Sequence, residues 1–443
     1  MNLTAMQLGS GLDGLTSRNV RELMMARLPA RASIVLETAG RLADELGVSA
    51  YVVGGIVRDL LRGAGNLDVD LVIEGDGIAF ARALAEETGG SVKGHKRFGT
   101  AIVTMQDGVK VDIASARKEF YPGPAALPTV KPGSIQEDLA RRDFTINTLA
   151  ISLNGRRFGE LIDFYGGQRD LKDKAICVLH RLSFAEDPTR VFRAIRFAQR
   201  FGFQLGNETL ALIKGAVKMD LFHRLSGQRL LNELTLLLSE PEPRHAVAHL
   251  AELGLLRFIH PGLKWSPRLE TLLKAVEDGV QWYRVLCRDR KLDAWLVYFM
   301  ALMEVLPPRA VSETVKRLRM PARDAERIKA GHAATNAVLR RLAKRPPPKP
   351  SDTCHALDGL ADETVLLLVA KAKSGSVKRQ VSAYFTAYQR TKPSLTGADL
   401  RALGLKPGPL YKRILGRLLD ARLDGDVNSE ADERELVKKF IRA

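Results

Sequence analysis

The chain has 443 residues, of which 45% are hydrophobic and 6% aromatic, and it carries a formal net charge of +17. Single cores rarely grow past roughly 250–300 residues, so several domains are expected. The strongly basic balance favours a polyanionic partner, although solubility alone would also account for it. The three cysteines are widely spaced, which argues against a disulfide scaffold and a structural zinc. The sequence has no apolar run of 18 residues and no leader-like start, which argues against a membrane partner and a signal peptide. We therefore expect the protein in the cytoplasm.

Residues 1–30 are polar and glycine-dotted and read as an N-terminal extension, and residues 31–46 have helical periodicity. An apolar strand then ends in Gly54-Gly55, a turn whose backbone N–H groups can face a phosphate. Asp68 and Asp70, separated by Val69, share one face of the next strand. Two such carboxylates repel each other unless a cation lies between them, and oxygen ligands suit Mg²⁺. Together these features suggest metal-assisted transfer of a nucleotide.

The stretch AIVTMQDGVKVDIA (residues 101–114) predicts a hairpin that turns at Asp107-Gly108. Its second strand directs Asp112 to the face opposite Val111, which makes Asp112 a candidate third carboxylate. The segment from Lys118 to Gln136 holds four prolines and two glycines, so we predict a long loop, functional or mobile.

Two later blocks carry further polar residues. In EDLARRDFTINTLA, Asp143 could simply cap a helix, but two adjacent arginines before a helix can also clamp a triphosphate. In AEDPTRVFRAIRFAQRF, Asp187 could likewise be a cap, with Pro188 at the first helical position. The arginines at 190, 193, 196 and 200 share one helical face, and such a face is usually just solvated.

After residue 181 or so, helical patterns run to the end of the chain, broken near 239–245, 306–310 and 345–352. The last break, RPPPKPSD, reads as a stiff polyproline-like linker. The pattern predicts an α+β head followed by an all-helical arm.

These motifs, in this order, resemble a known family. The GGxVRD pattern at residues 54–59, with Asp68-x-Asp70, resembles the DNA-polymerase-β-like nucleotidyltransferases. More narrowly it resembles the class II tRNA nucleotidyltransferases and bacterial poly(A) polymerases. RRDFTIN resembles the family's RRDFTxNA motif, with Thr148 where alanine is usual, and EDPTR resembles EDxxR. SGQRLLNELTLLL and GLKPGP resemble the neck and tail more loosely.

The resemblance implies a nucleotidyltransferase head with a small mixed sheet, followed by an all-α neck, body and tail. We expect an N-terminal extension over 1–30, the head over 31–180, the neck over 181–260, the body over 261–345 and a tRNA-binding tail over 346–443. It implies catalysis by Asp68, Asp70 and Asp112, with Mg²⁺ held by Asp68 and Asp70 in a two-metal mechanism. The implied nucleotide-binding residues are Gly54, Gly55, Arg58, Arg142, Asp143, Asn147, Asp187, Arg190, Arg193 and Arg196.

Asp187 and Arg190 are implied to read the incoming base. A carboxylate accepts from the amino group of cytosine or adenine while a guanidinium donates to the ring nitrogen, and uracil and guanine present the opposite pattern. The implied substrates are the 3′ end of tRNA and ATP, possibly with CTP. The long 118–136 segment favours addition of the terminal A alone, with full CCA addition as a competitor. A poly(A) polymerase acting on general RNA and an inactive RNA-binding relative remain alternatives.

Overall fold

A computed structural model of the chain describes residues 19–65, 68–95, 99–126 and 128–442. The chain divides into two compact units, Met1–Leu225 and Ser226–Ala443. The first unit is built on a mixed seven-stranded sheet and the described part of the second is helical, which confirms the predicted α+β fold class. No helix in the described ranges has the length and apolar character needed to cross a membrane.

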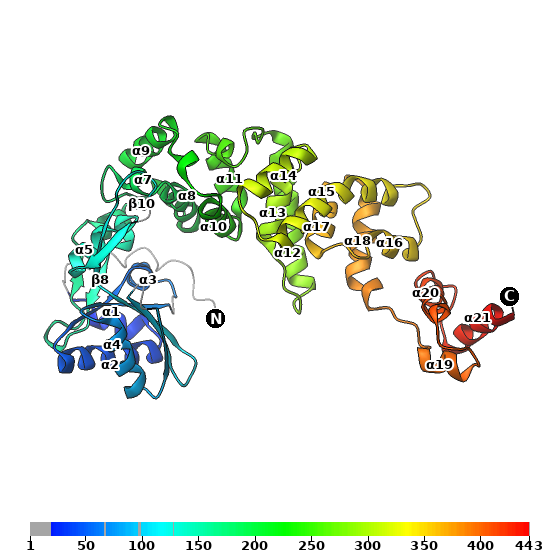
Figure 1. Cartoon of the computed structure of the whole chain (residues 1–443), viewed down its shortest axis with the longest axis horizontal. Coiled ribbons are helices and arrows are strands. Elements are labelled where there is room, and N and C mark those ends of the chain that lie inside the picture. The colour runs from blue at the N-terminus through cyan, green and yellow to red at the C-terminus, as the bar shows by residue number, and fades with distance from the viewer. Residues whose placement is uncertain (1–18, 66–67, 96–98, 127, 443) are drawn as a thin grey trace, which may run out of the picture. The chain divides into compact units, whose positions relative to one another are not determined.

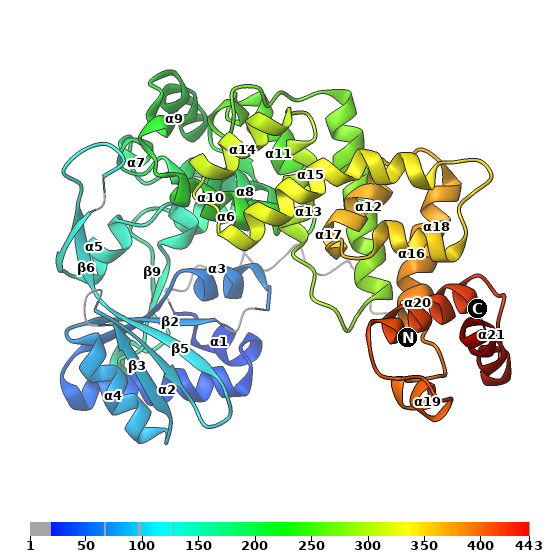
Figure 2. The same cartoon turned by 45° about the vertical axis from the view of Figure 1, so that its right-hand side comes forward.

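The sheet of the first unit has the strand order β3-β4-β5-β2-β1-β8-β9. Its strands are β1 (Ser49–Val53), β2 (Val69–Glu74), β3 (Ser91–His95), β4 (Thr100–Thr104), β5 (Lys110–Ser115), β8 (Ala150–Ser152) and β9 (Leu161–Ile162). Only the central pair β2–β5 is parallel; its neighbours are antiparallel. The predicted hairpin is confirmed as β4–β5. Helices α2 (Ala30–Leu46) and α4 (Gly77–Glu87) contact each other and pack on the strands (Figure 2).

Two predictions about this unit are wrong in part. Residues 1–18 lie outside the described residues, but α1 (Arg21–Arg27) forms inside the predicted extension and buries Met24 completely. The predicted loop over Lys118–Gln136 contains an antiparallel hairpin, β6 (Arg117–Phe120) with β7 (Thr129–Pro132), and the start of α5 (Ile135–Ala140). The hairpin registers Arg117 opposite Pro132.

The rest of the first unit is made of helices and short strands, some between the strands of the sheet and some after them (Figure 1). It comprises α3 (Gly55–Arg62), α6 (Gly167–Lys172), α7 (Ser183–Glu186), α8 (Thr189–Phe201), α9 (Asn207–Lys218), the strand pair β10 (Ala175–Ile176) and β11 (Gln204–Leu205), and a 3₁₀ turn over Thr145–Asn147. One face of α8 is apolar and buried, and Phe192 packs edge to face on Phe222.

The second unit runs from α10 (Gly227–Leu238) and α11 (Pro243–Glu252) through α12 (Pro267–Leu286), α13 (Ala294–Met303), α14 (Pro308–Arg317), α15 (Ala322–Leu342), α16 (Pro350–Leu357), α17 (Asp362–Lys371) and α18 (Gly375–Thr386) to α19 (Gly397–Ala402), α20 (Pro409–Leu423) and α21 (Glu430–Arg442). α13 is apolar on nearly all sides and buried, as such a helix must be. It packs against α10, α12, α15 and α17.

The boundary that we predict at residue 345 falls inside this packing. α17 contacts α12, α13 and α15, and its residues Val365 to Leu368 are almost fully buried. The proline-rich stretch therefore joins helices that share one core. Beyond residue 390 a smaller core gathers Leu395, which precedes α19, and Leu400, Ile414, Leu418 and Val437 from the last three helices.

Candidate active site

The turn between β1 and α3 brings backbone N–H groups next to an arginine. Gly54 has φ +72°, a conformation that favours glycine, and it precedes the first turn of α3. A Cβ on Gly54 would lie 2.5 Å from Arg142 Nη1, so a side chain there would displace the guanidinium. The glycine thus allows Arg142 and the N-terminus of α3 to approach each other, and together they present positive charge.

Arg142 is held by acceptors on two sides. Its Nη1 donates to the Asn147 carbonyl at 3.3 Å and its Nη2 to Asp138 Oδ2 at 3.3 Å. Its Nε is buried and has no hydrogen-bond partner among the described residues. Burial lowers the pKa of Arg142, against the opposing charge of Asp138. A largely buried guanidinium with an unused donor is a natural contact for an anionic ligand.

The predicted carboxylates meet on the central parallel strands. Asp70 of β2 and Asp112 of β5 are neighbours in the strand register, and Val69 and Val111 beside them are buried on the opposite face. Asp68 lies one residue before β2 and is exposed. Burial and the charges of Asp112 and Asp68 raise the pKa of Asp70 to about 6, in spite of the opposing charge of Arg142.

This arrangement fits a divalent cation that shares its ligands with a substrate. Within the described ranges, no three His, Cys, Asp or Glu side chains come close enough to hold a metal ion by themselves. Mg²⁺ is, however, commonly bound by one or two carboxylates together with substrate phosphates. The donors are oxygens, and burial first, then the charges of Asp112 and Asp68, raise the pKa of Asp70, which a bound cation would offset.

Asp143 connects the head to helix α8. Its Oδ1 accepts from the Phe144 N–H and from Asn147 Nδ2, both at 2.9 Å, and its Oδ2 accepts from Arg193 Nε at 2.8 Å and Nη2 at 2.5 Å. Burial raises the pKa of Asp143, but Arg193 and Asn147 outweigh it and hold that pKa below its usual range. Asp143 and Arg193 therefore form a buried ion pair beneath Asn147.

Arg58 supports the same asparagine. Its guanidinium makes a two-pronged ion pair with Asp59 at 2.9 and 2.7 Å and donates to Asn147 Oδ1 at 2.7 Å. The guanidinium also lies 4.5 Å from the ring centre of Phe201 on α8. Arg58 is buried, and its donors are directed to the protein, so the structure makes it a residue that positions Asn147.

The predicted base-reading pair lies at the start of α8. One Asp187 oxygen, Oδ1, accepts from the Thr189 N–H at 2.9 Å and from the Thr189 hydroxyl at 2.5 Å, which is a capping role. Arg190 is buried and donates to the Ser183 hydroxyl at 2.9 Å and to the Arg141 carbonyl at 2.8 Å. The arginine face is therefore only partly solvated, since Arg196 is also buried.

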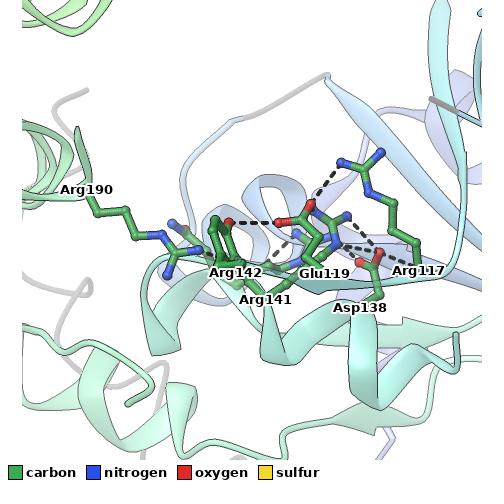
Figure 3. A network of polar contacts seen from close by, with 8 residues as sticks. Arg117, Glu119, Asp138, Arg141, Arg142 and Arg190 are labelled. Atoms are coloured by element: carbon green, nitrogen blue, oxygen red, sulfur yellow. Dashed lines mark hydrogen bonds and ion pairs between the residues drawn. The ribbon is translucent and has the colours of Figure 1, made fainter. Parts of the chain in front are cut away.

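A polar network next to this pair was not singled out from the sequence (Figure 3). Asp138 has no exposed side-chain surface and accepts from Arg141 at 2.7 Å and Arg142 at 3.3 Å. Glu119 of β6 accepts from Arg117 at 3.2 Å and from Arg141 at 3.3 Å. The signal was present, because residues three and four apart on a helix face each other and EDLARR places an aspartate at that spacing from both arginines.

Tyr121 extends this network toward α8. Its hydroxyl donates to Glu119 Oε2 at 2.9 Å. Burial and the charge of Glu119 raise the pKa of Tyr121 to about 12, and the charges of Arg190 and Asp187 act on it as well. Arg141 and Arg142, which we call the arginine clamp, thus lie in one contiguous region with the β6–β7 hairpin and the start of α8. The carboxylates of β2 and β5 lie on the sheet side of this region.

The chain matches two known family descriptions. Residues 50–177 match "Poly A polymerase head domain" and residues 202–266 match "Probable RNA and SrmB- binding site of polymerase A". The fold and the site geometry agree with the first match, because the carboxylate strands, the glycine turn and the arginine clamp all lie within it. The first unit thus contains a head domain of the poly(A) polymerase type.

Proteins that resemble nearly the whole chain identify the family more narrowly. The chain is 46% identical over 437 residues to an A-adding tRNA nucleotidyltransferase of Geobacter sulfurreducens, a match that covers 98% of this chain and 50% of the relative. It is 32% identical to an A-adding tRNA nucleotidyltransferase of Halalkalibacterium halodurans, with 96% of both chains covered. A solved CCA-adding enzyme in its apo form II superposes with a TM-score of 0.81 at 32% identity, covering 95% of this chain and 99% of that one.

The chain belongs to the family of class II tRNA nucleotidyltransferases and bacterial poly(A) polymerases. It spans about half the length of two of the curated relatives that it matches.

Proposed function

We propose that this chain adds the terminal adenosine to tRNA that already ends in CC, using ATP. One observation supports this most directly: Asp70, the neighbour of Asp112 in the strand register, lies within electrostatic range of Arg142, and Arg142 lies against the Gly54 turn. This pairs a cation site with a phosphate clamp. The two relatives described above are both named as A-adding enzymes, which supports adenosine as the unit transferred.

We infer that Asp68 and Asp70 hold Mg²⁺ and that Asp112 is a third, less central ligand. Mg²⁺ bound there would lower the pKa of the terminal ribose hydroxyl and neutralise the charge on the triphosphate and on the leaving pyrophosphate. The protein's contribution is to keep these carboxylates on one face of the sheet, with the buried Val69 and Val111 fixing the orientation of each strand.

The remaining residues would bind and orient the nucleotide. Arg142 would take a phosphate by giving up its long 3.3 Å hydrogen bonds to the Asn147 carbonyl and to Asp138. The Gly54-Gly55 turn would add backbone donors. Asn147, held by Arg58 and Asp143, would contact the sugar, so Arg58, Asp143 and Arg193 would act by positioning Asn147 and not by touching the substrate.

Base choice would rest on Asp187 and Arg190. Arg190 uses two of its five N–H donors for Ser183 and Arg141, which leaves donors for a ring nitrogen. Its bond to the Arg141 carbonyl would link base choice to the phosphate clamp one residue away. Arg196, which lies over the ring of Phe197 at 4.8 Å, would support the helix from within.

We place the 3′ acceptor end of tRNA at this site and propose that the later helices, including residues 346–443, hold the rest of the RNA by its backbone. The cysteines Cys177, Cys287 and Cys354 are all free thiols, as expected for a reducing compartment such as the cytoplasm.

The deciding experiment uses three tRNAs, one lacking the tail, one ending in C and one ending in CC, each incubated with ATP or CTP alone and sized. We expect efficient single addition of A to the CC form and little use of CTP on the tailless form. Addition of two Cs to the tailless tRNA would replace the A-only proposal by CCA addition, and a ladder of many As on unstructured RNA would indicate a poly(A) polymerase. No incorporation in any arm, from protein that binds tRNA, would indicate an inactive relative.

A further inference from the structure

A cavity of about 390 Å³ is lined by residues of α12, α17 and α18, within the second unit. Its size falls within the roughly 300–1,000 Å³ of small-molecule sites. Four residues of α12 line it, namely Ala275, Asp278, Gly279 and Trp282. Their spacing of i, i+3, i+4 and i+7 is that of a single helical face, so α12 presents one continuous stripe to the cavity.

Gly279 keeps this cavity open. It lies in the interior of the 20-residue helix α12 and is buried, yet a Cβ added there would meet no heavy atom within 4 Å. Glycine in a helix interior is less favourable than nearly every other residue, so helix stability does not account for it. Its structural effect is to leave room that a larger side chain would fill.

An aromatic side chain forms one wall. Trp282 is partly exposed and packs on Phe385, with ring centres 5.9 Å apart and planes inclined at 65°. Phe385 is buried and also packs on Tyr283 at 5.3 Å. The indole is therefore supported from behind by an ordered aromatic group and offers a flat apolar surface beside a hollow. Flat π surfaces of this kind stack on nucleobases of any sequence.

The rim of the cavity is positively charged. Lys378 and Arg379 of α18 line it and are exposed, and neither has an acidic partner in the part of the chain that the structure describes. The carboxylate at the cavity, Asp278, already pairs with Lys274 at 3.1 Å. A base-sized apolar hollow with a cationic rim complements a nucleotide, whose base is flat and whose phosphate is anionic. An apolar peptide side chain could fill the cavity but would not pair with Lys378 and Arg379.

We propose that this cavity binds one unpaired nucleotide of an RNA strand, with its base on Trp282 and its phosphate on Lys378 and Arg379. Bases inside a duplex are stacked and paired, so only a single-stranded or splayed-out nucleotide can enter. Two adjacent cations along α18 suit consecutive phosphates of a strand better than one isolated phosphate. The inference goes beyond the transfer reaction and rests on the proposed function only in taking RNA as the polymer.

The test is a binding measurement on the full chain, without ATP or CTP and with EDTA present, so that nucleotide transfer plays no part in it. Trp265 and Trp295 are changed to Phe, which leaves Trp282 as the only tryptophan. A single-stranded oligoadenylate is expected to quench Trp282 fluorescence saturably. An equal concentration of AMP, or of a blunt RNA duplex of the same length, is expected to quench it far less.

Two sets of variants complete the test. Gly279→Leu fills the hollow and is expected to weaken strand binding about tenfold, the effect of losing one stacked base, with an unchanged or raised Tm. Gly215→Leu in α9 is the matched control, because that helical glycine is also open to space but lies far along the chain. Lys378→Gln with Arg379→Gln is expected to weaken binding and flatten its salt dependence.

The proposal is overturned if Gly279→Leu leaves both the quench and the affinity unchanged. It is equally overturned if AMP quenches as strongly as the strand, which would indicate a free-nucleotide site, or if the duplex does so, which would indicate a backbone contact. Loss of A addition in an activity assay would bear on the head alone and leave this result untouched.

Discussion

Asp70 is a carboxylate whose surroundings favour its protonated form. Burial and the neighbouring charges of Asp112 and Asp68 raise its pKa to about 6, from an ordinary value of 3.8. At pH values between 3.8 and about 6, the Asp70 carboxyl therefore holds a proton in the folded state that it has already lost in the unfolded state. Stability falls as the pH rises through this window, and the penalty is fully present above pH 6 or so. A divalent cation between the carboxylates would remove it.

Asp70→Asn should therefore abolish transfer and also stabilise the metal-free protein. A pKa difference of this size corresponds to about 3 kcal/mol, which solvent screening reduces to an expected gain of ~1–2 kcal/mol at pH 7.5. Thermal unfolding in EDTA at pH 7.5 and at pH 4.5 measures this, with a smaller gain expected at the lower pH. Added Mg²⁺ should raise the Tm of the native protein but not that of the variant. An equal gain at both pH values would show that the ionised form of Asp70 is not the cause.

Asp187→Asn separates the two roles of Asp187. The side-chain oxygen of the introduced asparagine can still accept from Thr189, so the start of α8 should stay capped. The negative charge is lost and an amide donor replaces one oxygen, which suits the O4 carbonyl of uracil. We expect discrimination between ATP and UTP to shrink by about 1–3 kcal/mol. Competition assays with both nucleotides measure it, and Asp187→Ser is the control that retains a cap. Unaltered selectivity in both variants would make Asp187 a cap only.

At the scale of single residues, the sequence predicted which side chains lie on the same face of a strand, but not which side chains contact each other. Period-two alternation placed Asp70 and Asp112 correctly on the polar side of their strands. This alternation could not predict that Arg58 donates its hydrogen bonds to Asp59 and Asn147, because Asn147 lies 89 residues away in the sequence. Side-chain partners so distant in sequence depend on the tertiary fold.

At the scale of elements, the β6–β7 hairpin shows where pattern reasoning stops. All four residues of β7 are exposed, so the strand has no buried face and no alternation to reveal it. Three of the segment's four prolines lie between the two strands and its two glycines lie between or after them, and these residue types indicate a loop. What holds the hairpin is its network with α5, in which Glu119 and Asp138 share Arg141.

Breaking that network should cost stability and substrate binding together. Asp138→Asn removes the buried charge that fixes Arg141 and Arg142, and unpairing a buried ion pair costs about 3 kcal/mol. Urea denaturation should show this loss, and the KM for ATP should rise because Arg142 is no longer held. Glu137→Gln is the matched control: Glu137 pairs with a partly exposed Lys118 and Gln preserves the capping box, so a much smaller loss is expected. Equal losses in both variants would contradict the role given to Asp138.

At the scale of the whole molecule, composition and motif order predicted an α+β unit followed by helices, because these depend on local pattern. The division within the helical part was not predictable in the same way. The RPPPKPSD stretch has linker chemistry, yet α16 begins inside it, and α15 before it packs on both α16 and α17. Local composition reports how stiff a connection is and not whether the helices it joins share a core.

Two truncations test this division. A chain ending at residue 349 loses α17, whose buried Leu366, Leu367 and Leu368 contact α12, α13 and α15, so the second unit should unfold. A chain ending at residue 390 loses only the helices that enclose Leu395 and Leu418, a core of their own, and should keep most of its helical content and a cooperative transition.

Circular dichroism melts of both truncated chains decide between these outcomes. If the 349 chain melts as cooperatively as the full chain, the shared core is not what holds the second unit together. The 390 chain should also bind tRNA more weakly and with a flatter dependence on salt, because Lys406, Lys412 and Arg413 are among the cations removed. An unchanged salt slope would remove the last three helices from the RNA contact while leaving the shared core of α12–α17 intact.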